Sequence, residues 1–153
     1  MASALNEIQF ACFSLDNNLF CVDLMRIKEI MPAQVIISLP TPSRYLDGVI
    51  NLRGSVIPVM NLKKRFGIPG VDSVTIGNLI VVKLANQLLA LSVDEVHEVI
   101  TVPIDKIKAV PDIEDGLGAE CILGVCLHAE NVYIVLGIDM LISPTESDVI
   151  FDV

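Results

Sequence analysis

The chain contains 153 residues, which suffices for one large domain or two small ones with a sizeable buried core. Hydrophobic residues make up 53% and aromatic residues 5%, with no Trp, and this aliphatic composition is typical of β-sheet proteins. The formal net charge of -9 argues against a nucleic-acid binder, because contacts to phosphates require a broad basic surface.

The apolar runs fall short of the roughly 18 to 20 residues that span a bilayer. The N-terminal residues lack a basic region followed by an apolar stretch, which a secretory signal would show. We therefore expect a cytoplasmic protein with no direct membrane insertion.

Charge is distributed unevenly along the chain. Residues 1–70 carry seven Lys and Arg against five Asp and Glu (+2), whereas residues 71–153 carry three against fourteen (-11). A solvated surface that confers solubility explains the acidic half more simply than a specific basic partner does.

In chain order, the first predicted elements are short strands around a turn at Asp16–Asn18. The segment Gly48–Gly67 (GVINLRGSVIPVMNLKKRFG) then predicts a β-hairpin with its turn at Arg53–Gly54. Pro58 removes one backbone donor, so the returning strand is expected to be an edge strand or to contain a bulge. One helical turn over 62–66 follows, ended by Gly67.

The chain also contains an internal repeat in two blocks. Residues 19–31 match residues 88–100 at an offset of 69, and residues 46–62 match residues 122–138 at an offset of 76. Each unit has too few elements for a parallel sheet with crossover helices, and its short strands and frequent turns favour small closed β-barrels. We therefore predict an all-β fold of two similar small β-barrels with few short helices.

The predicted subdomains are a first barrel over residues 1–70 and a second over residues 71–153, the latter including a C-terminal tail. Alternation along the strands assigns eight apolar residues to each core. The first set is Phe10, Cys12, Phe20, Val22, Leu24, Ile50, Leu52 and Val59. The second set is Leu79, Val81, Leu89, Leu91, Val93, Val125, Ile134 and Leu136.

Residues that could carry chemistry do not form a recognisable constellation. The four cysteines contain no CxxC pair and are expected to be buried reduced thiols, and a zinc site from Cys121, Cys126 and His128 lacks a fourth ligand. His97 and His128 have no nucleophile motif beside them, and Gly116–Gly118 is too short to hold a phosphate. We expect no catalytic residues, no metal, no cofactor and no small-molecule substrate, so the remaining function is recognition.

Arg53 is the strongest candidate for recognition, because it places a planar five-donor guanidinium at the tip of an apolar hairpin. As a plain turn residue it would only aid solubility. As a binding residue it suits an interfacial carboxylate or the carbonyl end of a helix. The patch Lys63, Lys64 and Arg65 is a second candidate, because it and Arg53 have no counterparts in the second repeat.

The hairpin segment resembles the signature of CheW-like domains, adaptor proteins of chemotaxis arrays. The resemblance rests on residues 48–54 (GVINLRG), Pro58–Val59, Leu62 and Arg65–Gly67, and it extends from Phe10 to about Leu141. It departs at Asn61, where the family usually has Asp. It implies one CheW-like domain over residues 1–153, with two five-stranded SH3-like barrels packed together.

The resemblance also implies site residues. In CheW-like proteins the groove between the barrels takes the hairpin tip of a chemoreceptor, and the corresponding positions here are Ile27, Glu29, Val49 and Arg53. The regulatory domain of the histidine kinase would contact barrel ends, for which the region of Leu39, Thr41 and Tyr45 and the edge of the second barrel are the candidates.

The function implied is a non-catalytic adaptor that couples methyl-accepting chemotaxis receptors to the histidine kinase CheA at membrane-associated arrays. The alternative is a CheW-like adaptor of another pathway, such as pilus motility or control of a cyclase, which would bind different partners in the same way. A small β-barrel enzyme or a nucleic-acid binder is the alternative from a different class, and the sequence offers neither a polar catalytic pocket nor a broad basic surface for it.

Overall fold

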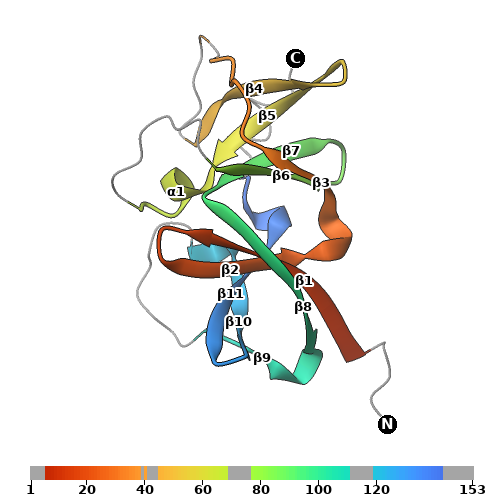
Figure 1. Cartoon of the computed structure of the whole chain (residues 1–153), viewed down its shortest axis with the longest axis vertical. Coiled ribbons are helices and arrows are strands. Elements are labelled where there is room, and N and C mark those ends of the chain that lie inside the picture. The colour runs from red at the N-terminus through yellow and green to blue at the C-terminus, as the bar shows by residue number, and fades with distance from the viewer. Residues whose placement is uncertain (1–5, 39, 41–44, 69–76, 111–118, 143–153) are drawn as a thin grey trace.

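Two β-sheets packed against each other form the protein (Figure 1). The computed structural model describes residues 6–38, 40, 45–68, 77–110 and 119–142. The prediction of a mostly β fold with few short helices is confirmed, because the only α-helix among the described residues is the single turn α1 (Leu62–Arg65).

The six-stranded sheet lies in the lower half of Figure 1. Its strands, in spatial order, are β8 (Glu95–Pro103), β1 (Glu7–Leu15), β2 (Asn18–Asp23), β11 (Asn131–Leu136), β10 (Ile122–His128) and β9 (Ile107–Lys108). Three short 3-10 turns accompany it: η3 (Ile104–Lys106), η4 (Ala119–Cys121) and η5 (Ile138–Met140).

The five-stranded sheet lies above it. Its strands, in spatial order, are β3 (Ile27–Pro32), β6 (Asn78–Lys83), β7 (Leu88–Val93), β5 (Ser55–Asn61) and β4 (Leu46–Leu52). The 3-10 turn η2 (Leu24–Arg26) carries the chain from β2 in the lower sheet to β3 in the upper one.

The two sequence repeats exchange their first hairpins. The six-stranded sheet combines β1 and β2 of the first repeat with β8–β11 of the second, and the five-stranded sheet combines β6 and β7 of the second with β3–β5 of the first. Neither sheet is therefore built from residues 1–70 or 71–153 alone, which corrects the expectation that each segment forms its own barrel. The cause is the pair of crossovers, at η2 and between β7 and β8, where the chain changes sheets.

The sheets are not closed barrels, which also corrects the prediction. In each sheet, however, the segment that follows one edge strand forms a short backbone pairing near the opposite edge. In the five-stranded sheet, Ile37, which follows edge strand β3, forms an isolated bridge with Val49 of the opposite edge strand β4. In the six-stranded sheet, β9, which follows edge strand β8, pairs with β10. The packing is therefore curled and SH3-like.

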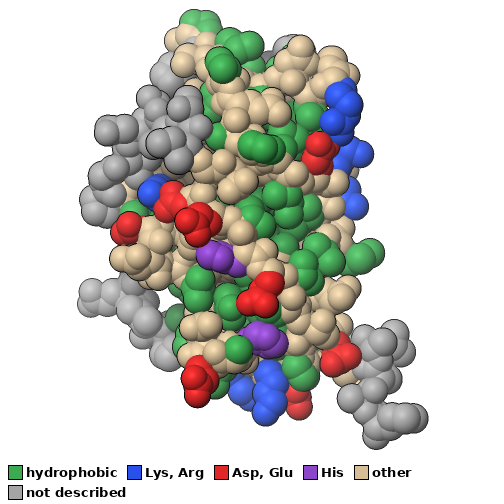
Figure 2. Space-filling model, in the orientation of Figure 1, with side chains coloured by type: hydrophobic (Ala, Val, Ile, Leu, Met, Phe, Trp, Pro, Cys, Tyr) green, Lys and Arg blue, Asp and Glu red, His purple; other side chains and the backbone are tan. Residues whose placement is uncertain are grey.

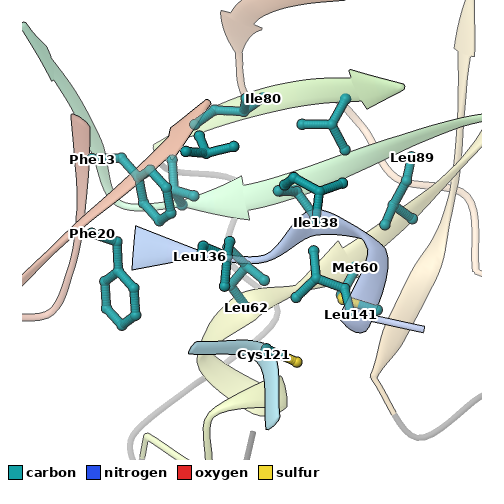
Figure 3. Packing of buried hydrophobic residues seen from close by; sticks show 14 of the residues in the cluster. Phe13, Phe20, Met60, Leu62, Ile80, Leu89, Cys121, Leu136, Ile138 and Leu141 are labelled. Carbon is teal, nitrogen blue, oxygen red and sulfur yellow. The ribbon is translucent and has the colours of Figure 1, made fainter. Parts of the chain in front are cut away.

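Strands buried on both faces explain the continuous apolar runs of the sequence, such as Leu79–Val82. One face of each sheet lines the core between the sheets, shown in Figure 3. This cluster includes Phe13, Phe20, Met60, Leu62, Ile80, Leu89, Leu136, Ile138 and Leu141. The opposite faces line two smaller cores, one within the curve of each sheet.

Most of the predicted core residues are buried, but they divide differently among the cores. Thirteen of the sixteen are buried, and Leu24, Val125 and Ile134 are half-buried. Cys126 and Tyr133 line the smaller core, whereas Ile134 packs with Leu136 against the core between the sheets. The predicted parity therefore holds on this hairpin, where Val125 lies directly opposite Ile134, and only the degree of burial of these two residues is lower than expected.

Pro58 lies in an inner strand, since β5 pairs with both β4 and β7. Its ladder with β7 begins one residue later, at Val59, and its ladder with β4 contains a register shift between Leu46 and Gly48. The extra residue at that shift, Asp47, lies in β4, so β5 is neither an edge strand nor itself bulged, and both predicted alternatives are wrong.

Candidate functional site

The hairpin turn between β4 and β5 positions Arg53. Arg53 and Gly54 both have positive φ, 50° and 89°, and the Asn51 side chain accepts a hydrogen bond from the Gly54 backbone N–H at 2.9 Å. Two consecutive left-handed residues match the type I′ turn that suits the twist of a two-residue hairpin. The turn therefore projects the Arg53 side chain from the tip of the hairpin, 69% exposed.

Arg53 reaches Glu29 on the opposite edge of the same sheet. Its guanidinium forms two contacts with the Glu29 carboxylate, one of them between Nη1 and Oε2 at 3.3 Å, in a fork-to-fork arrangement. Hydrogen bonding from Arg53 lowers the pKa of Glu29 below its ordinary value. Two of the four residues predicted for receptor binding, 24 positions apart in sequence, are thus in direct contact.

The other two predicted receptor residues lie on the two edge strands of the same sheet, but a register shift after Ile27 places Ile27 and Glu29 on opposite faces of β3, because Ile27 lies opposite Val82 and Glu29 opposite Val81. Ile27 starts β3, is half-buried and packs against the core between the sheets. Val49 is half-buried in β4, at the bridge to Ile37. Two other apolar side chains of η2 and β3 are exposed, Met25 at 77% and Ile30 at 41%.

Apolar and basic side chains also gather on one face of the molecule. In Figure 2, hydrophobic side chains gather in the middle of the face, where the two sheets meet, and Lys and Arg side chains follow its upper right edge. The arrangement offers apolar contact area beside orienting charges, which is the usual composition of a protein-binding surface.

The residues predicted for kinase binding are less informative. Leu39 and Thr41 lie outside the described residues. Tyr45 is buried, its backbone oxygen accepts a hydrogen bond from Asn61 N–H at 2.9 Å, and the Arg65 guanidinium lies 4.9 Å from the centre of its ring. Tyr45 is 7% exposed and therefore packs mainly inside the fold.

The predicted basic patch is dispersed. Lys63 pairs with Asp94 at 3.0 Å and Lys64 pairs with Asp47 at 2.8 Å, whereas Arg65 is 4% exposed. Consecutive residues of a helix point about 100° apart, so three in a row do not share a face. The patch does not form one surface.

Arg65 instead connects the two repeats. Its guanidinium binds the Glu120 carboxylate at 2.6 Å and donates a hydrogen bond to the Leu141 backbone oxygen at 2.9 Å. The charge is thus satisfied by a carboxylate and a carbonyl of the second repeat, as a buried guanidinium requires. The sequence marked this residue as unusual, but its role is internal.

Asn61, where the family usually has Asp, has a clear local role. Its side-chain oxygen caps α1 by accepting a hydrogen bond from Lys64 N–H at 3.2 Å, and its amide nitrogen donates to the Asp47 carboxylate, also at 3.2 Å. An amide can donate to Asp47 where an ionised carboxylate would repel it.

The sequence analysis missed an exposed apolar strip on β10 and β11. Leu123 and Leu127 on β10 and Val132 on β11 are 62%, 65% and 58% exposed, and Leu127 lies directly opposite Val132. We call these three residues the β10–β11 strip. Exposure could have been inferred from the sequence repeat, because the first-repeat equivalents of the two leucines are the polar residues Asp47 and Asn51.

The thiols and histidines behave as structural residues. All four cysteines are buried thiols, as predicted, and burial raises the pKa of Cys12 to about 12. His97 is exposed and His128 is half-buried. The part of the chain that the structure describes contains no cluster of His, Cys, Asp and Glu able to hold a metal ion, nor any helix long and apolar enough to cross a membrane.

Comparison with known proteins identifies the family. The CheW-like domain profile matches residues 9–146. Chemotaxis protein CheW of Treponema pallidum (strain Nichols) is 32% identical over 149 residues, 94% of this chain and 88% of that protein. Chemotaxis protein CheW of Thermotoga maritima is 28% identical over 142 residues, 93% of this chain and 92% of that protein.

A solved structure agrees with the sequence comparisons. The crystal structure of scaffolding protein TtCheW from Thermoanaerobacter tengcongensis matches with a TM-score of 0.81 and 29% sequence identity, over 89% of this chain and 92% of that chain. The fold, the extent of the match and the hairpin signature agree, and the chain belongs to the CheW-like family of chemotaxis scaffold proteins.

Proposed function

We propose that this protein is a non-catalytic adaptor that couples chemoreceptors to the histidine kinase CheA in chemotaxis, at membrane-associated receptor arrays to which its partners recruit it. The observation that carries the proposal is the Arg53–Glu29 ion pair on β3, the strand that also carries half-buried Ile27 and that follows exposed Met25 of η2. Holding both partners in a fixed geometry raises their effective concentration, so that a conformational change in the receptor can bias the kinase.

The receptor tip is proposed to bind across the edge that joins β3 to the β4–β5 hairpin. Ile27 and Val49 supply apolar contact area, while Glu29 and Arg53 orient the incoming helices. Because Arg53 already pairs with Glu29, its second role is to hold the hairpin against β3 in the free protein. Binding then requires little reorganisation of this edge.

The kinase regulatory domain is proposed to bind the β10–β11 strip, at the edge of the second repeat. The first repeat builds the same hairpin with Asp47 and Asn51 at the positions of Leu123 and Leu127. The hairpin therefore folds without leucines there, and the exposed leucines are better explained by an interface.

Co-elution of the chain with a chemoreceptor tip fragment and with the kinase regulatory domain tests the proposal. The wild type should bind both at micromolar concentration, and Arg53→Glu should weaken receptor binding while kinase binding remains. Lys106→Glu, which reverses an exposed charge on η3, is the matched control and should bind as the wild type does. A wild type that binds neither partner contradicts the adaptor function.

The double reversal Glu29→Arg with Arg53→Glu separates two roles of the ion pair. Restored receptor binding indicates that the intramolecular pair shapes the surface. Binding that stays weak indicates that the Arg53 charge contacts the receptor itself. If Arg53→Glu binds the receptor unchanged, the assignment of Arg53 is wrong while the adaptor function stands.

A further inference from the structure

Arg26 connects the crossover between the sheets to both of them. It is the last residue of η2, and its Nε and Nη2 atoms donate to the Lys83 backbone oxygen at 3.2 and 2.8 Å. Its Nη1 and Nη2 atoms also bind the Asp139 carboxylate at 3.0 and 2.7 Å. Lys83 ends β6 of the five-stranded sheet, and Asp139 follows β11 of the six-stranded sheet.

The contacts of Arg26 fix orientation more than they add stability. An ion pair with a carboxylate that is 68% exposed contributes little to folding. The Arg26 guanidinium, however, binds the Lys83 backbone oxygen on one side and the Asp139 carboxylate on the other, and together these two groups define its position and its plane. No residue of η2 is fully buried, although Leu24 packs half-buried against the core between the sheets. Within the turn, Met25 N–H donates to the Asp23 side chain and Ile27 N–H donates to the Leu24 backbone oxygen.

The residues on either side of Arg26 belong to the proposed receptor surface. Met25, which is 77% exposed, precedes it, and Ile27 follows it directly, with Glu29 two residues further along β3. We propose that Arg26 is a positioning residue for receptor binding, which holds η2 and the start of β3 in the orientation that presents Met25 and Ile27. This inference rests on the proposed adaptor function.

The second crossover supports this reading, because it carries an ion pair of the same design. Asp139 corresponds to Lys63 at the repeat offset of 76, and Lys63 pairs at 3.0 Å with Asp94, which lies between β7 and β8. In the first pair the cation, Arg26, is at the crossover, and in the second the anion, Asp94, is. In both pairs the partner lies in the short helical turn after the last strand of a repeat, η5 or α1. An ion pair of this kind therefore occurs at both crossovers. The pair at η2 lies next to the residues that are proposed to contact the receptor.

Binding measurements on the full chain test the proposal. We expect Arg26→Ala to weaken binding of a receptor tip fragment about tenfold or more, a change typical of a residue that matters to an interface. Binding of the kinase regulatory domain should stay within about twofold, and Tm should fall by less than about 4 °C. The matched control is Lys106→Ala, which removes a cation from the last position of η3 and should change none of the three values.

Two further measurements distinguish positioning from general structure. Arg26→Lys keeps the charge but not the fork, so it should recover only part of the receptor affinity. Hydrogen exchange at Ile27, whose backbone N–H donates to Leu24, should accelerate in Arg26→Ala, since this bond reports the order of η2.

Unchanged receptor affinity in Arg26→Ala overturns the inference, as does an equal loss of receptor and kinase binding with a large fall in Tm. Unchanged exchange at Ile27 also overturns it, because positioning would then not depend on Arg26. A wild type that binds no receptor fragment defeats the proposed function instead, and the exchange measurement still tests whether Arg26 orders η2.

Discussion

Gly48 and Gly124 occupy the same place in the two repeats, where the chain after an edge strand approaches the opposite edge. A Cβ atom on Gly48 would lie 2.1 Å from the Ile37 backbone oxygen, and one on Gly124 would lie 2.6 Å from the Lys108 backbone oxygen. The sequence repeat identified both glycines, but the reason for them is steric: a side chain would push away the segment that draws the sheet edges together.

Gly48→Ala is expected to destabilise the protein by about 1 to 3 kcal/mol, because a backbone carbonyl must move to admit the methyl group. Chemical denaturation followed by circular dichroism measures the effect. Gly54→Asn is the control. Gly48 and Gly54 both have positive φ, 152° and 89°, but a Cβ atom on Gly54 would meet nothing within 4 Å, and Asn tolerates a positive φ. Equal destabilisation by both substitutions would show that backbone conformation, and not the contact with Ile37, decides the cost.

Glu120 is expected to make stability depend on pH through its pairing with Arg65. The hydrogen bond from Arg65 lowers the pKa of Glu120 below the ordinary value of 4.5. A carboxylate with a depressed folded-state pKa contributes stability above its unfolded pKa, and this contribution is lost as pH falls through the folded value. Glu120→Gln should therefore be less stable than the wild type at pH 7 by less than about 1 kcal/mol, since the carboxylate is largely exposed.

Unfolding curves recorded from pH 7 down to acid check this expectation. The difference between wild type and Glu120→Gln should narrow below the ordinary carboxyl pKa. In an Arg65→Met background the same substitution should have no pH-dependent effect, as a double-mutant cycle requires if Arg65 is the cause. A difference that persists in that background would assign the pKa shift to another group.

At the scale of elements, the hairpins β4–β5 and β10–β11 share a backbone but differ in their surfaces. The first carries Arg53 at its turn, with Asp47 and Asn51 on β4 and exposed Val56 on β5. The second carries the β10–β11 strip and has Ala129 and Glu130 at the turn, both with positive φ of 49° and 68°. The common pattern builds the fold, so the differences between the hairpins are where partner specificity is expected.

Replacing Leu123 by Asp and Leu127 by Asn gives the second hairpin the polar residues of the first. Because both leucines are mostly exposed, we expect stability to change by less than about 1 kcal/mol. Affinity for the kinase regulatory domain should fall at least about tenfold if these residues are anchors of the interface. Calorimetric titration provides the affinities, and unchanged kinase binding in a folded variant would remove the strip from the proposed interface.

At the scale of the whole molecule, the exchange of hairpins makes the two repeats interdependent. Residues 1–70 contain β1 and β2 without β8 and β11, to which they pair, and residues 71–153 contain β6 and β7 without β3 and β5. Each repeat alone would expose unpaired strand edges and the apolar faces that form the core between the sheets.

Separately expressed fragments 1–70 and 71–153 are therefore expected not to fold alone but to assemble when mixed. Circular dichroism should show little native β-structure in either fragment, and size-exclusion chromatography of the mixture should show a one-to-one complex. A stable, monomeric fragment 1–70 with β-sheet structure would contradict the interdependence of the repeats. The intact chain under the same conditions is the reference.

The sequence by itself determined the fold class, the repeat, the hairpin turn at Arg53–Gly54 and most of the buried positions. These features depend on local patterns: strand alternation, turn residues and the apolar runs of strands covered on both faces. The family signature in the β4–β5 hairpin could also be recognised from the sequence, because its residues lie close together in the chain.

Only the tertiary structure decided how the repeats combine. A repeated sequence is equally compatible with hairpins that stay in their own sheet and hairpins that exchange, because both arrangements bury the same residues. The partners of Arg53, Arg26 and Arg65 lie 24, 113 and 55 positions away, and no local pattern encodes such distances. Long-range pairing therefore determined which charges remain on the surface for recognition and which hold the sheets together.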